Sequence, residues 1–204
     1  MVLEIQALDG AELKEEEMVK LNRPYLTMKE MDRIITLSRS PRDRLILRLL
    51  SRTGIRVGEL LALRVEDIDF EKRTLLIEAE KSKKEKRRLV PVDQGTLNGT
   101  QRYLGERKEG KVFELTRQRI DQIIKDLGKK AGVESVLDFY TGSERKLHAH
   151  TFRHSFAVNW IKTLGSGKLV ELSRHLGHQS IETTMIYLRF SPEAVHEAYD
   201  ELWK

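Results

Sequence analysis

Apolar residues recur along most of the chain at steps of three and four, the spacing that places side chains on one face of an α-helix. Some helix ends are marked by their own residues, because Thr27 and Glu30 form a capping box and Gly54 follows an apolar segment. Predicted helices follow Thr27, Pro41, Thr116, His150 and Ser180, begin at Arg56 or Val57, and cover about residues 97–107 and 168–176.

The pattern changes to that of β-strands between residues 74 and 92, where TLLIEA and RLVPV flank the basic segment KSKKEKR. We expect two short strands joined by a hairpin, with Pro91 indicating an edge strand. Residues 132–147 are expected to form a loop. The sequence therefore predicts an α+β fold that is mainly α-helical, with a small antiparallel β-sheet.

The last quarter of the chain, residues 148–187, contains five of the six histidines. The helix after His150 has an apolar stripe that leaves Arg153 and His154 on other faces. His150 and Arg153 are three residues apart at the helix entrance, so their side chains can project to the same side. The stripe consists of Phe152, Phe156, Trp160, Ile161 and Leu164.

A glycine ends the helix that follows, because Gly177 comes directly after its last apolar residue and places His178 on the next turn. Ser180 can then cap a further helix, whose apolar stripe is Ile181, Met185 and Leu188. A rotation of ~100° per residue places Tyr187 about 120° from that stripe. We therefore expect Tyr187 to point away from the core.

The composition narrows the classes of function. The chain has 204 residues, a net charge of +5 and a pI near 9.3, which mildly favours a polyanionic partner. It has no cysteine, so disulfides, thiolate metal sites and cysteine nucleophiles are excluded. No apolar run approaches ~20 residues and no signal peptide is present, so we expect a cytoplasmic, nucleoid-associated protein without a membrane partner.

Arg56 is unusual because it precedes a helix, where the helix dipole disfavours a cation. Two interpretations are open. Arg56 can form a salt bridge with Glu59 one turn later, or it can face an anion together with Arg153 while Glu59 holds its guanidinium group.

Basic residues cluster at two further places. The hairpin carries Lys81, Lys83, Lys84, Lys86, Arg87 and Arg88, and the helix after Thr116 presents Arg117 and Arg119 on its outer face. A charged hairpin tip is as consistent with a solvated turn as with a segment that enters a DNA groove.

Two metal-site alternatives are weak. Glu66, Asp67 and Asp69 surround a turn, where acidic residues are common. His150 and His154 have the spacing of a helical zinc pair, but no suitably placed third ligand accompanies them. We interpret His148, His154 and His175 as structural or DNA-proximal.

Four motifs together resemble the tyrosine recombinase (phage integrase) family. They are TGIRVGELLALRVEDID, the hairpin EKSKKEKRRLVPV, HTFRHSFAVNW and LGHQSIETTMIY, and they occur in the order and approximate spacing of that family. The resemblance extends from Leu26 to about Phe190 and is nearest to the Xer-type and archaeal integrase branches. It implies the catalytic core of DNA breaking-rejoining enzymes.

In that family a tyrosine attacks a DNA phosphodiester, which produces a 3′-phosphotyrosine bond and a free 5′-hydroxyl without metal or nucleotide cofactor. The resemblance implies that Tyr187 is the nucleophile, nine residues after the site histidine His178. It places the remaining catalytic positions at Arg56, Lys81, His150 and Arg153, with Lys83 replacing Lys81 if the hairpin register differs by two.

The chemistry explains these residue types. Two arginines neutralise the negative charge of a pentacoordinate phosphorus, and His150 is the candidate base for the phenol. The hairpin lysine can protonate the leaving 5′-oxygen, and His178 can donate a hydrogen bond to a phosphate oxygen.

The same resemblance implies how the chain is divided and what it binds. We expect an N-terminal linker or remnant at residues 1–24, the catalytic domain at 25–190, and a C-terminal helix at 191–204 that packs on its own core or is exchanged between protomers. The implied partner is double-stranded DNA, bound by a homotetramer on paired sites, with a monomer or dimer in the absence of DNA. Alternatives are relaxation of supercoils, as by a type IB topoisomerase, and a DNA-binding accessory protein that does not cut.

Overall fold

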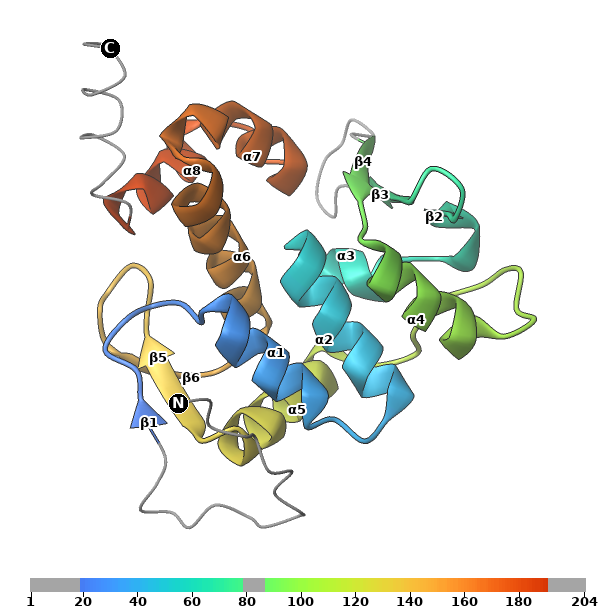
Figure 1. Ribbon diagram of the computed structural model, residues 1–204, viewed down its shortest axis with the longest axis horizontal. Helices are drawn as coiled ribbons and strands as arrows, with labels where there is room; N and C mark the ends of the chain where they lie inside the picture. Colours follow the sequence, from blue (N-terminus) through green and yellow to red (C-terminus); the bar gives the residue numbers. More distant parts are fainter. Residues whose placement is uncertain (1–18, 79–86, 191–204) are drawn as a thin grey trace, which may run out of the picture.

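The computed structural model describes residues 19–78 and 87–190, and most of these residues are helical (Figure 1). Two helices, α2 (Pro41–Thr53) and α6 (Ala149–Leu164), pack against each other in the middle of the molecule. The other helices surround this pair, and one small sheet lies on each side of it. The predicted fold class, mainly α-helical with a small antiparallel sheet, is confirmed.

Most predicted helix boundaries in the first half of the chain agree with the structure, but the helix predicted at about residues 97–107 covers Gln94–Leu104. Thr27 and Glu30 form the expected capping box of α1 (Met28–Thr36), and Thr116 caps α5 (Arg117–Lys130). The remaining helices of this half are α3 (Val57–Ala62), the short 3₁₀ helix η2 (Val65–Asp67) and α4 (Gln94–Leu104). Local caps and breakers therefore determine where these helices begin and end.

The predicted hairpin is part of a three-stranded antiparallel sheet with the order β2-β3-β4. The strands are β2 (Ile68–Asp69), β3 (Thr74–Glu78) and β4 (Arg87–Pro91). Pro91 lies on the edge strand, as its lack of a backbone N–H requires. The hairpin tip, with Lys81, Lys83, Lys84 and Lys86, lies outside the described residues.

A second sheet occupies the segment for which a loop was expected. Strands β5 (Val133–Leu137) and β6 (Glu144–Lys146) pair antiparallel, and β1 (Val19–Lys20) pairs parallel with β5. The loop prediction for residues 132–147 was therefore wrong. These strands are too short to show a clear period in the sequence, and β1 is distant from β5 along the chain.

The apolar core consists of two clusters that meet along α6. The larger cluster packs around α2, and the smaller one contains Phe139, Val158 and Leu176. Because α6 has neighbours on several sides, it is buried well beyond its predicted stripe, and Arg153 is buried with it. Leu164, the last residue of the predicted stripe, is exposed.

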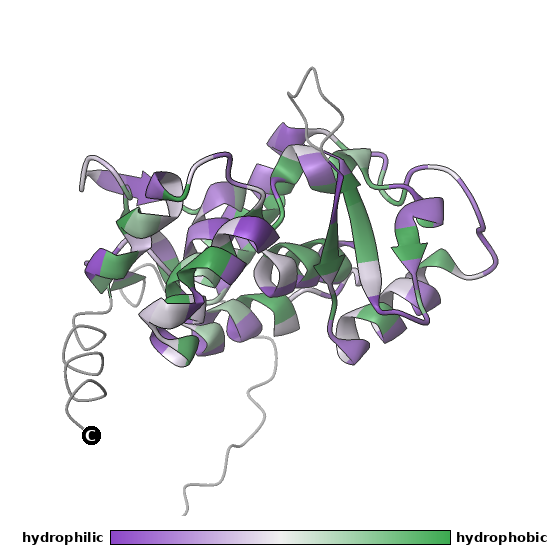
Figure 2. Cartoon of the chain, turned by 90° about the horizontal axis from the view of Figure 1, so that it is seen from above, coloured by the Kyte–Doolittle hydropathy of each residue, from purple (hydrophilic) through white to green (hydrophobic). Residues whose placement is uncertain are grey.

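Figure 2 shows apolar and polar residues interleaved along the helices. Within residues 19–78 and 87–190, no helix is long and apolar enough to span a bilayer.

The chain turns sharply at Gly54, where α2 ends and the site segment begins. Gly54 has a φ of 62°, in the left-handed region that glycine adopts without a steric penalty. A Cβ atom at this position would lie 2.5 Å from Cδ1 of Phe156 on α6. Glycine is therefore required both by the backbone conformation and by the close approach of α6.

We predict that Gly54→Ala lowers the free energy of unfolding by about 2–4 kcal/mol, because left-handed strain and overpacking both contribute. Gly142→Ala is the matched control, since Gly142 has a φ of 71° but no atom within 4 Å of the place that a Cβ atom would take. Urea unfolding should show a loss of only about 1 kcal/mol for the control. Equal losses for the two variants would contradict the proposed contact with Phe156.

Candidate active site

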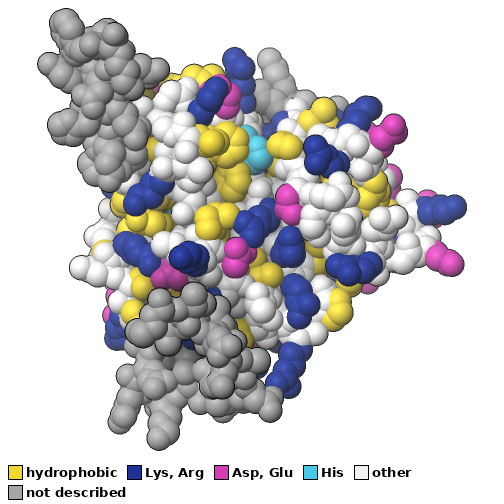
Figure 3. Space-filling model, viewed as in Figure 1, with side chains coloured by type: hydrophobic (Ala, Val, Ile, Leu, Met, Phe, Trp, Pro, Cys, Tyr) yellow, Lys and Arg dark blue, Asp and Glu magenta, His cyan; other side chains and the backbone are white. Residues whose placement is uncertain are grey.

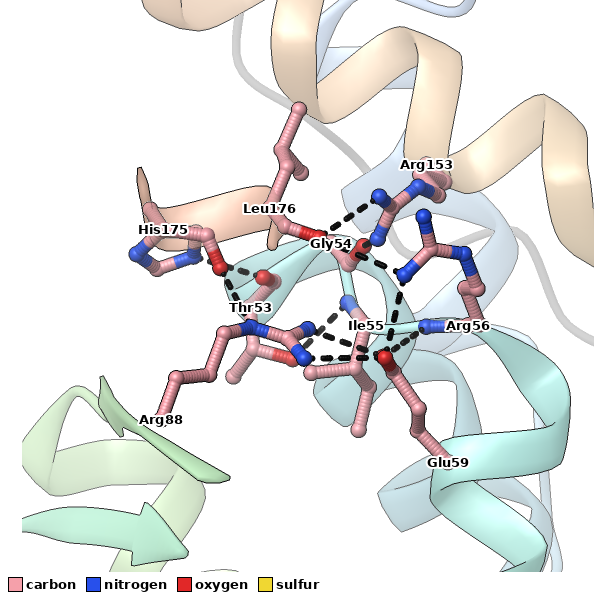
Figure 4. A network of polar contacts seen from close by, with 9 residues as sticks. All are labelled: Thr53, Gly54, Ile55, Arg56, Glu59, Arg88, Arg153, His175 and Leu176. Carbon is pink, nitrogen blue, oxygen red and sulfur yellow. Dashed lines mark hydrogen bonds and ion pairs between the residues drawn. The ribbon is translucent and has the colours of Figure 1, made fainter. Parts of the chain in front are cut away.

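Two arginines from distant parts of the chain meet at the centre of the site (Figure 4). Arg56 precedes α3, and Arg153 lies in the second turn of α6. Arg153 donates to the carbonyl oxygens of Gly54, at 2.7 Å, and Leu176, at 2.8 Å. Arg56 donates to the same Leu176 oxygen at 3.4 Å. The turn after α2 and the end of α7 (Leu169–Leu176) therefore hold both guanidinium groups together.

The guanidinium groups of Arg56 and Arg153 are both positive and repel each other. The buried carboxylate of Glu59 offsets this repulsion. Glu59 is fully buried and accepts hydrogen bonds from the backbone N–H of Arg56, at 2.7 Å, and from its guanidinium, at 3.1 Å. Burial alone raises the pKa of Glu59, but the hydrogen bonds and charges of Arg88 and Arg56 outweigh it and lower the pKa. The expected contact between Glu59 and Arg56 is present.

Arg153 remains charged despite its burial. Burial and the neighbouring Arg56 lower its pKa to about 10. A guanidinium with this pKa is still protonated at neutral pH, so the site presents two permanent cations.

His178 follows the end of α7, whose last carbonyl binds both arginines. Gly177, with a φ of 66°, ends α7 as predicted and directs the chain toward His178. The Nδ1 atom of His178 lies 2.8 Å from the hydroxyl of Thr184. Burial, together with the charges of Arg153 and Arg56, lowers the pKa of His178 to about 4, so its ring is neutral near pH 7.

His150 lies at the start of α6 and is exposed on the rim of a cavity of about 280 Å³. Arg117 and Arg145 also line this cavity, as do Asp121 and Asp138, so charges of both signs surround it. Desolvation by the surrounding atoms and then the positive neighbours, His148 and Arg153 first among them, lower the pKa of His150 to about 4. A neutral imidazole at this position can accept a proton.

Tyr187 is oriented differently from the prediction. Its side chain is only 2% exposed, in the smaller apolar cluster, and the prediction that it points away from the core was wrong. Helix α8 (Glu182–Met185) has only four residues and tightens into the 3₁₀ helix η4 (Ile186–Phe190). This geometry turns Thr184 and Tyr187 inward and leaves Met185, on the predicted apolar stripe, 49% exposed.

The hydroxyl of Tyr187 meets a histidine that the sequence did not assign to catalysis. Nδ1 of His154 lies 3.0 Å from the Tyr187 hydroxyl oxygen. Phe139 stacks on the His154 ring at 4.4 Å and meets the Tyr187 ring edge-on at 5.1 Å. The spacing of His150 and His154, one helical turn apart, was the only sequence signal for this contact, and Phe139 had none.

Burial raises the pKa of Tyr187 to about 12, although Arg153 and Arg56 act in the opposite direction. Burial and the nearby His150 lower the pKa of His154 to about 3. The phenol therefore stays protonated and forms its hydrogen bond with a neutral His154. In this arrangement Tyr187 is not an activated nucleophile.

The basic residues assigned to DNA contact divide into three groups. Lys83, Lys84 and Lys86 lie outside the described residues, as does Lys81. Arg87, Arg117 and Arg119 are exposed, which is compatible with their predicted contact with DNA. Figure 3 shows Lys and Arg side chains spread over one face, with acidic side chains between them.

Arg88 forms the third group, and its position differs from the predicted contact with DNA. Its guanidinium points inward and binds both oxygens of Glu59, at 2.9 Å each. The strand alternation places it on the face opposite Arg87, toward α3 and α7. A guanidinium group used in this way is not presented to a phosphate outside the protein.

The acidic residues considered as metal ligands accept hydrogen bonds from neighbouring turns of the chain. Glu66 accepts from Arg64 and from the backbone N–H of Gly110, and Asp69 accepts from two backbone N–H groups. The described part of the chain contains no group of three His, Cys, Asp or Glu residues placed to hold a metal ion.

We predict that Tyr187 is protected from nitration in the free protein, because its ring is buried and its raised pKa disfavours the reactive phenolate. Tyr140, which is 70% exposed, serves as an internal control. Treatment with tetranitromethane followed by peptide mass spectrometry should show Tyr140 modified much faster than Tyr187. Similar rates at the two residues would show that the buried conformation is not the dominant one.

We also predict that the protein loses stability as the pH falls from about 6.5 toward 4. The lowered pKa values of His150, His154 and His178 mean that the unfolded chain binds more protons in this range, so the free energy of unfolding decreases as the pH falls. Each histidine contributes a slope of at most about 1.4 kcal/mol per pH unit, less where solvent screens it.

Urea unfolding at pH 7 and pH 5 measures this effect. His154→Gln keeps a hydrogen-bond acceptor for Tyr187 but does not titrate, so its profile should be flatter than that of the wild type. Equal slopes for the two proteins would rule out a lowered pKa at His154.

Known proteins resemble this chain in sequence and in fold. Residues 24–193 match the phage integrase family. The tyrosine recombinase XerA of Pyrococcus horikoshii is 29% identical over 204 aligned residues, which covers 95% of this chain and 66% of the relative. XerA of Pyrococcus furiosus is 32% identical over 170 residues, covering 78% and 54%.

Solved structures show the same fold. The crystal structure of XerA recombinase superposes with a TM-score of 0.67 at 28% identity, covering 87% of this chain and 64% of that one. The XerH recombinase, solved in a pre-cleavage complex with its difH substrate, superposes with a TM-score of 0.69 at 24% identity, covering 90% and 55%.

The chain spans roughly half to two thirds of the length of these curated relatives. The family match covers most of the chain, and the Xer recombinases among the relatives confirm the resemblance noted in the sequence motifs. This chain belongs to the phage integrase family and contains a tyrosine recombinase catalytic domain of the Xer type.

Proposed function

We propose that this chain is the catalytic domain of a site-specific DNA recombinase, which cleaves and rejoins DNA through a 3′-phosphotyrosine intermediate. The observation that carries the proposal is the convergence of Arg56 and Arg153 on the Leu176 carbonyl, close enough to Tyr187 for their charges to act on its phenol. Two fixed cations beside a tyrosine match the needs of phosphoryl transfer to a phenolic oxygen.

The arginines bind the scissile phosphate and stabilise the transition state. The pentacoordinate phosphorus carries additional negative charge on its non-bridging oxygens, and guanidinium groups can bond to these oxygens bidentately. Because Glu59 and the backbone carbonyls already orient both groups, little reorganisation accompanies the reaction.

His178 supplies a further hydrogen bond to the phosphate. In the tautomer whose Nδ1 accepts from Thr184, the neutral ring carries its proton on Nε2. That N–H donates to a phosphate oxygen without adding a charge that depends on pH near neutrality.

Tyr187 leaves its buried position before it attacks. A phosphate on DNA cannot reach a hydroxyl whose side chain is 2% exposed. Moving the phenol from the Phe139–His154 contact toward Arg56 and Arg153 removes the desolvation that raises its pKa and adds positive potential that lowers it. The same movement therefore exposes the nucleophile and activates it.

Proton transfer accompanies both bond changes. His150 accepts the phenolic proton as the P–O(Tyr) bond forms, since its lowered pKa keeps the ring unprotonated at neutral pH. The 5′-oxygen takes a proton as its bond to phosphorus breaks, and Lys81 is the proposed donor, with Lys83 as its alternative. The phosphotyrosine bond retains the energy of the broken linkage, so rejoining needs no nucleotide.

Double-stranded DNA is the proposed partner. The XerH relative was solved bound to its difH substrate, which supports this choice, as do the exposed Arg87, Arg117 and Arg119. We further propose that a homotetramer acts on paired sites in the cytoplasm, in association with the nucleoid.

We predict that the protein forms a covalent complex with a nicked suicide duplex, whose short 5′ fragment diffuses away and prevents rejoining. The substrate must carry the cognate site, identified first by selecting binding sequences from a random DNA pool. Denaturing electrophoresis should show a DNA-linked protein band that persists in EDTA.

Variants identify the residues responsible. Tyr187→Phe should abolish the band. Arg153→Gln should lower the cleavage rate by about 10²–10³, the range typical of losing one transition-state donor. Binding without a band in the wild type would support a non-cutting accessory protein. Relaxation of supercoiled DNA without recombinant products would support an enzyme of the topoisomerase type.

A further inference from the structure

Arg88 belongs to the basic hairpin in sequence but to the arginine site in space. It lies on β4, and its side chain is 14% exposed, whereas that of the adjacent Arg87 is 53% exposed. Arg87 forms an ion pair with Glu78 on the neighbouring strand. Two consecutive arginines on one strand therefore have different environments.

Three of the five N–H donors of Arg88 are used inside the protein (Figure 4). Nη1 and Nη2 bind the two carboxylate oxygens of Glu59 at 2.9 Å each, and Nε binds the carbonyl oxygen of His175 at 2.8 Å. The guanidinium group also lies against Gly177, where an added Cβ would come within 3.0 Å of it. A side chain at Gly177 would therefore press against the guanidinium group of Arg88.

Both groups that Arg88 holds are connected directly to the site. Glu59 also binds the backbone and the guanidinium of Arg56. The His175 carbonyl belongs to the same helix end as the Leu176 carbonyl, which binds Arg56 and Arg153. Arg88 therefore fixes the carboxylate that orients one arginine and the helix end that orients both.

We propose that Arg88 is a positioning residue, which holds Glu59 and the end of α7 so that Arg56, Arg153 and His178 face one phosphate. This inference rests on the proposed function, because it assigns a role within the same site. It differs from the role expected from the basic hairpin, in which Arg88 contacts the DNA backbone.

Charge and burial favour the positioning role. A DNA phosphate that captured Arg88 would have to displace the buried Glu59 carboxylate, which would keep only Arg56 as a charged partner. Removing one member of a buried ion pair is costly because the remaining charge is left without compensation.

DNA binding provides the first test. Binding of Arg88→Met and Arg87→Met would be measured in the Tyr187→Phe background, by fluorescence anisotropy at several salt concentrations. A phosphate contact contributes a slope of about −0.9 to the dependence of log K on log salt. We expect Arg88→Met to leave this slope unchanged. A slope reduced by about one unit would overturn the proposal.

The cleavage rate at saturating DNA provides the second test. Arg88→Met should lower this rate at least tenfold, and Arg88→Lys should restore part of it because lysine keeps the charge but loses the bidentate geometry. Arg102→Met, which removes one exposed arginine on α4 outside the site, should stay within twofold of the wild type. A wild-type rate for Arg88→Met would exclude a positioning role.

A double-mutant cycle covers the case in which Arg88→Met folds poorly. Glu59→Gln combined with Arg88→Met leaves no buried unpaired carboxylate, so the double variant should unfold at a higher temperature than Arg88→Met alone. Its cleavage rate should be no lower than that of the slower single variant, because both residues act through Arg56. Additive effects on cleavage and on unfolding would overturn the proposal.

These measurements separate the proposal from the proposed function. If the wild type makes no covalent complex with its selected site, the proposed function fails. The salt slope and the unfolding cycle need no cleavage, so they still decide whether Arg88 anchors Glu59 or contacts DNA.

Discussion

The site depends on one buried carboxylate that keeps several cations close together. Arg56, Arg88 and Arg153 are close enough for their positive charges to repel one another. Without a counterion, this repulsion would separate them. Glu59 accepts four hydrogen bonds from Arg56 and Arg88, and two backbone carbonyls accept hydrogen bonds from Arg153. The positive charges are thus in position before DNA binds, so a phosphate group can bind to them with little rearrangement of the protein.

Tyr187, the proposed nucleophile, feels the charges of Arg153 and Arg56 but is held by other contacts. Phe139 and His154 surround Tyr187 in an apolar cluster, where the phenol is protonated and inaccessible. A recombinase that kept an activated tyrosine beside two arginines would be ready to cut any phosphodiester that it met. Under the proposed function, the burial of Tyr187 makes cleavage depend on a movement of this side chain. DNA can favour that movement only if it binds the state with Tyr187 exposed more tightly than the buried state.

Much of this arrangement was predictable from the sequence, because local interactions encode it. The capping box at Thr27, the glycines at 54 and 177, and the edge proline at 91 define element boundaries within a few residues. The resemblance of four motifs to the recombinase family pointed to the candidate site residues, and the chemistry of phosphoryl transfer to a phenol explains why such cations are suited to it.

Only the tertiary structure decided which way particular side chains face. Tyr187 is buried because α8 tightens into η4 against α6 and Phe139, which a uniform helical period does not anticipate. Arg88 points inward because a buried Glu59 lies opposite its strand face, although its neighbours in sequence are basic. Strand β1 pairs with β5, which lies far along the chain from it. A sequence pattern indicates the secondary structure that a segment prefers. Whether a given side chain is buried depends on which distant segments of the chain pack against it.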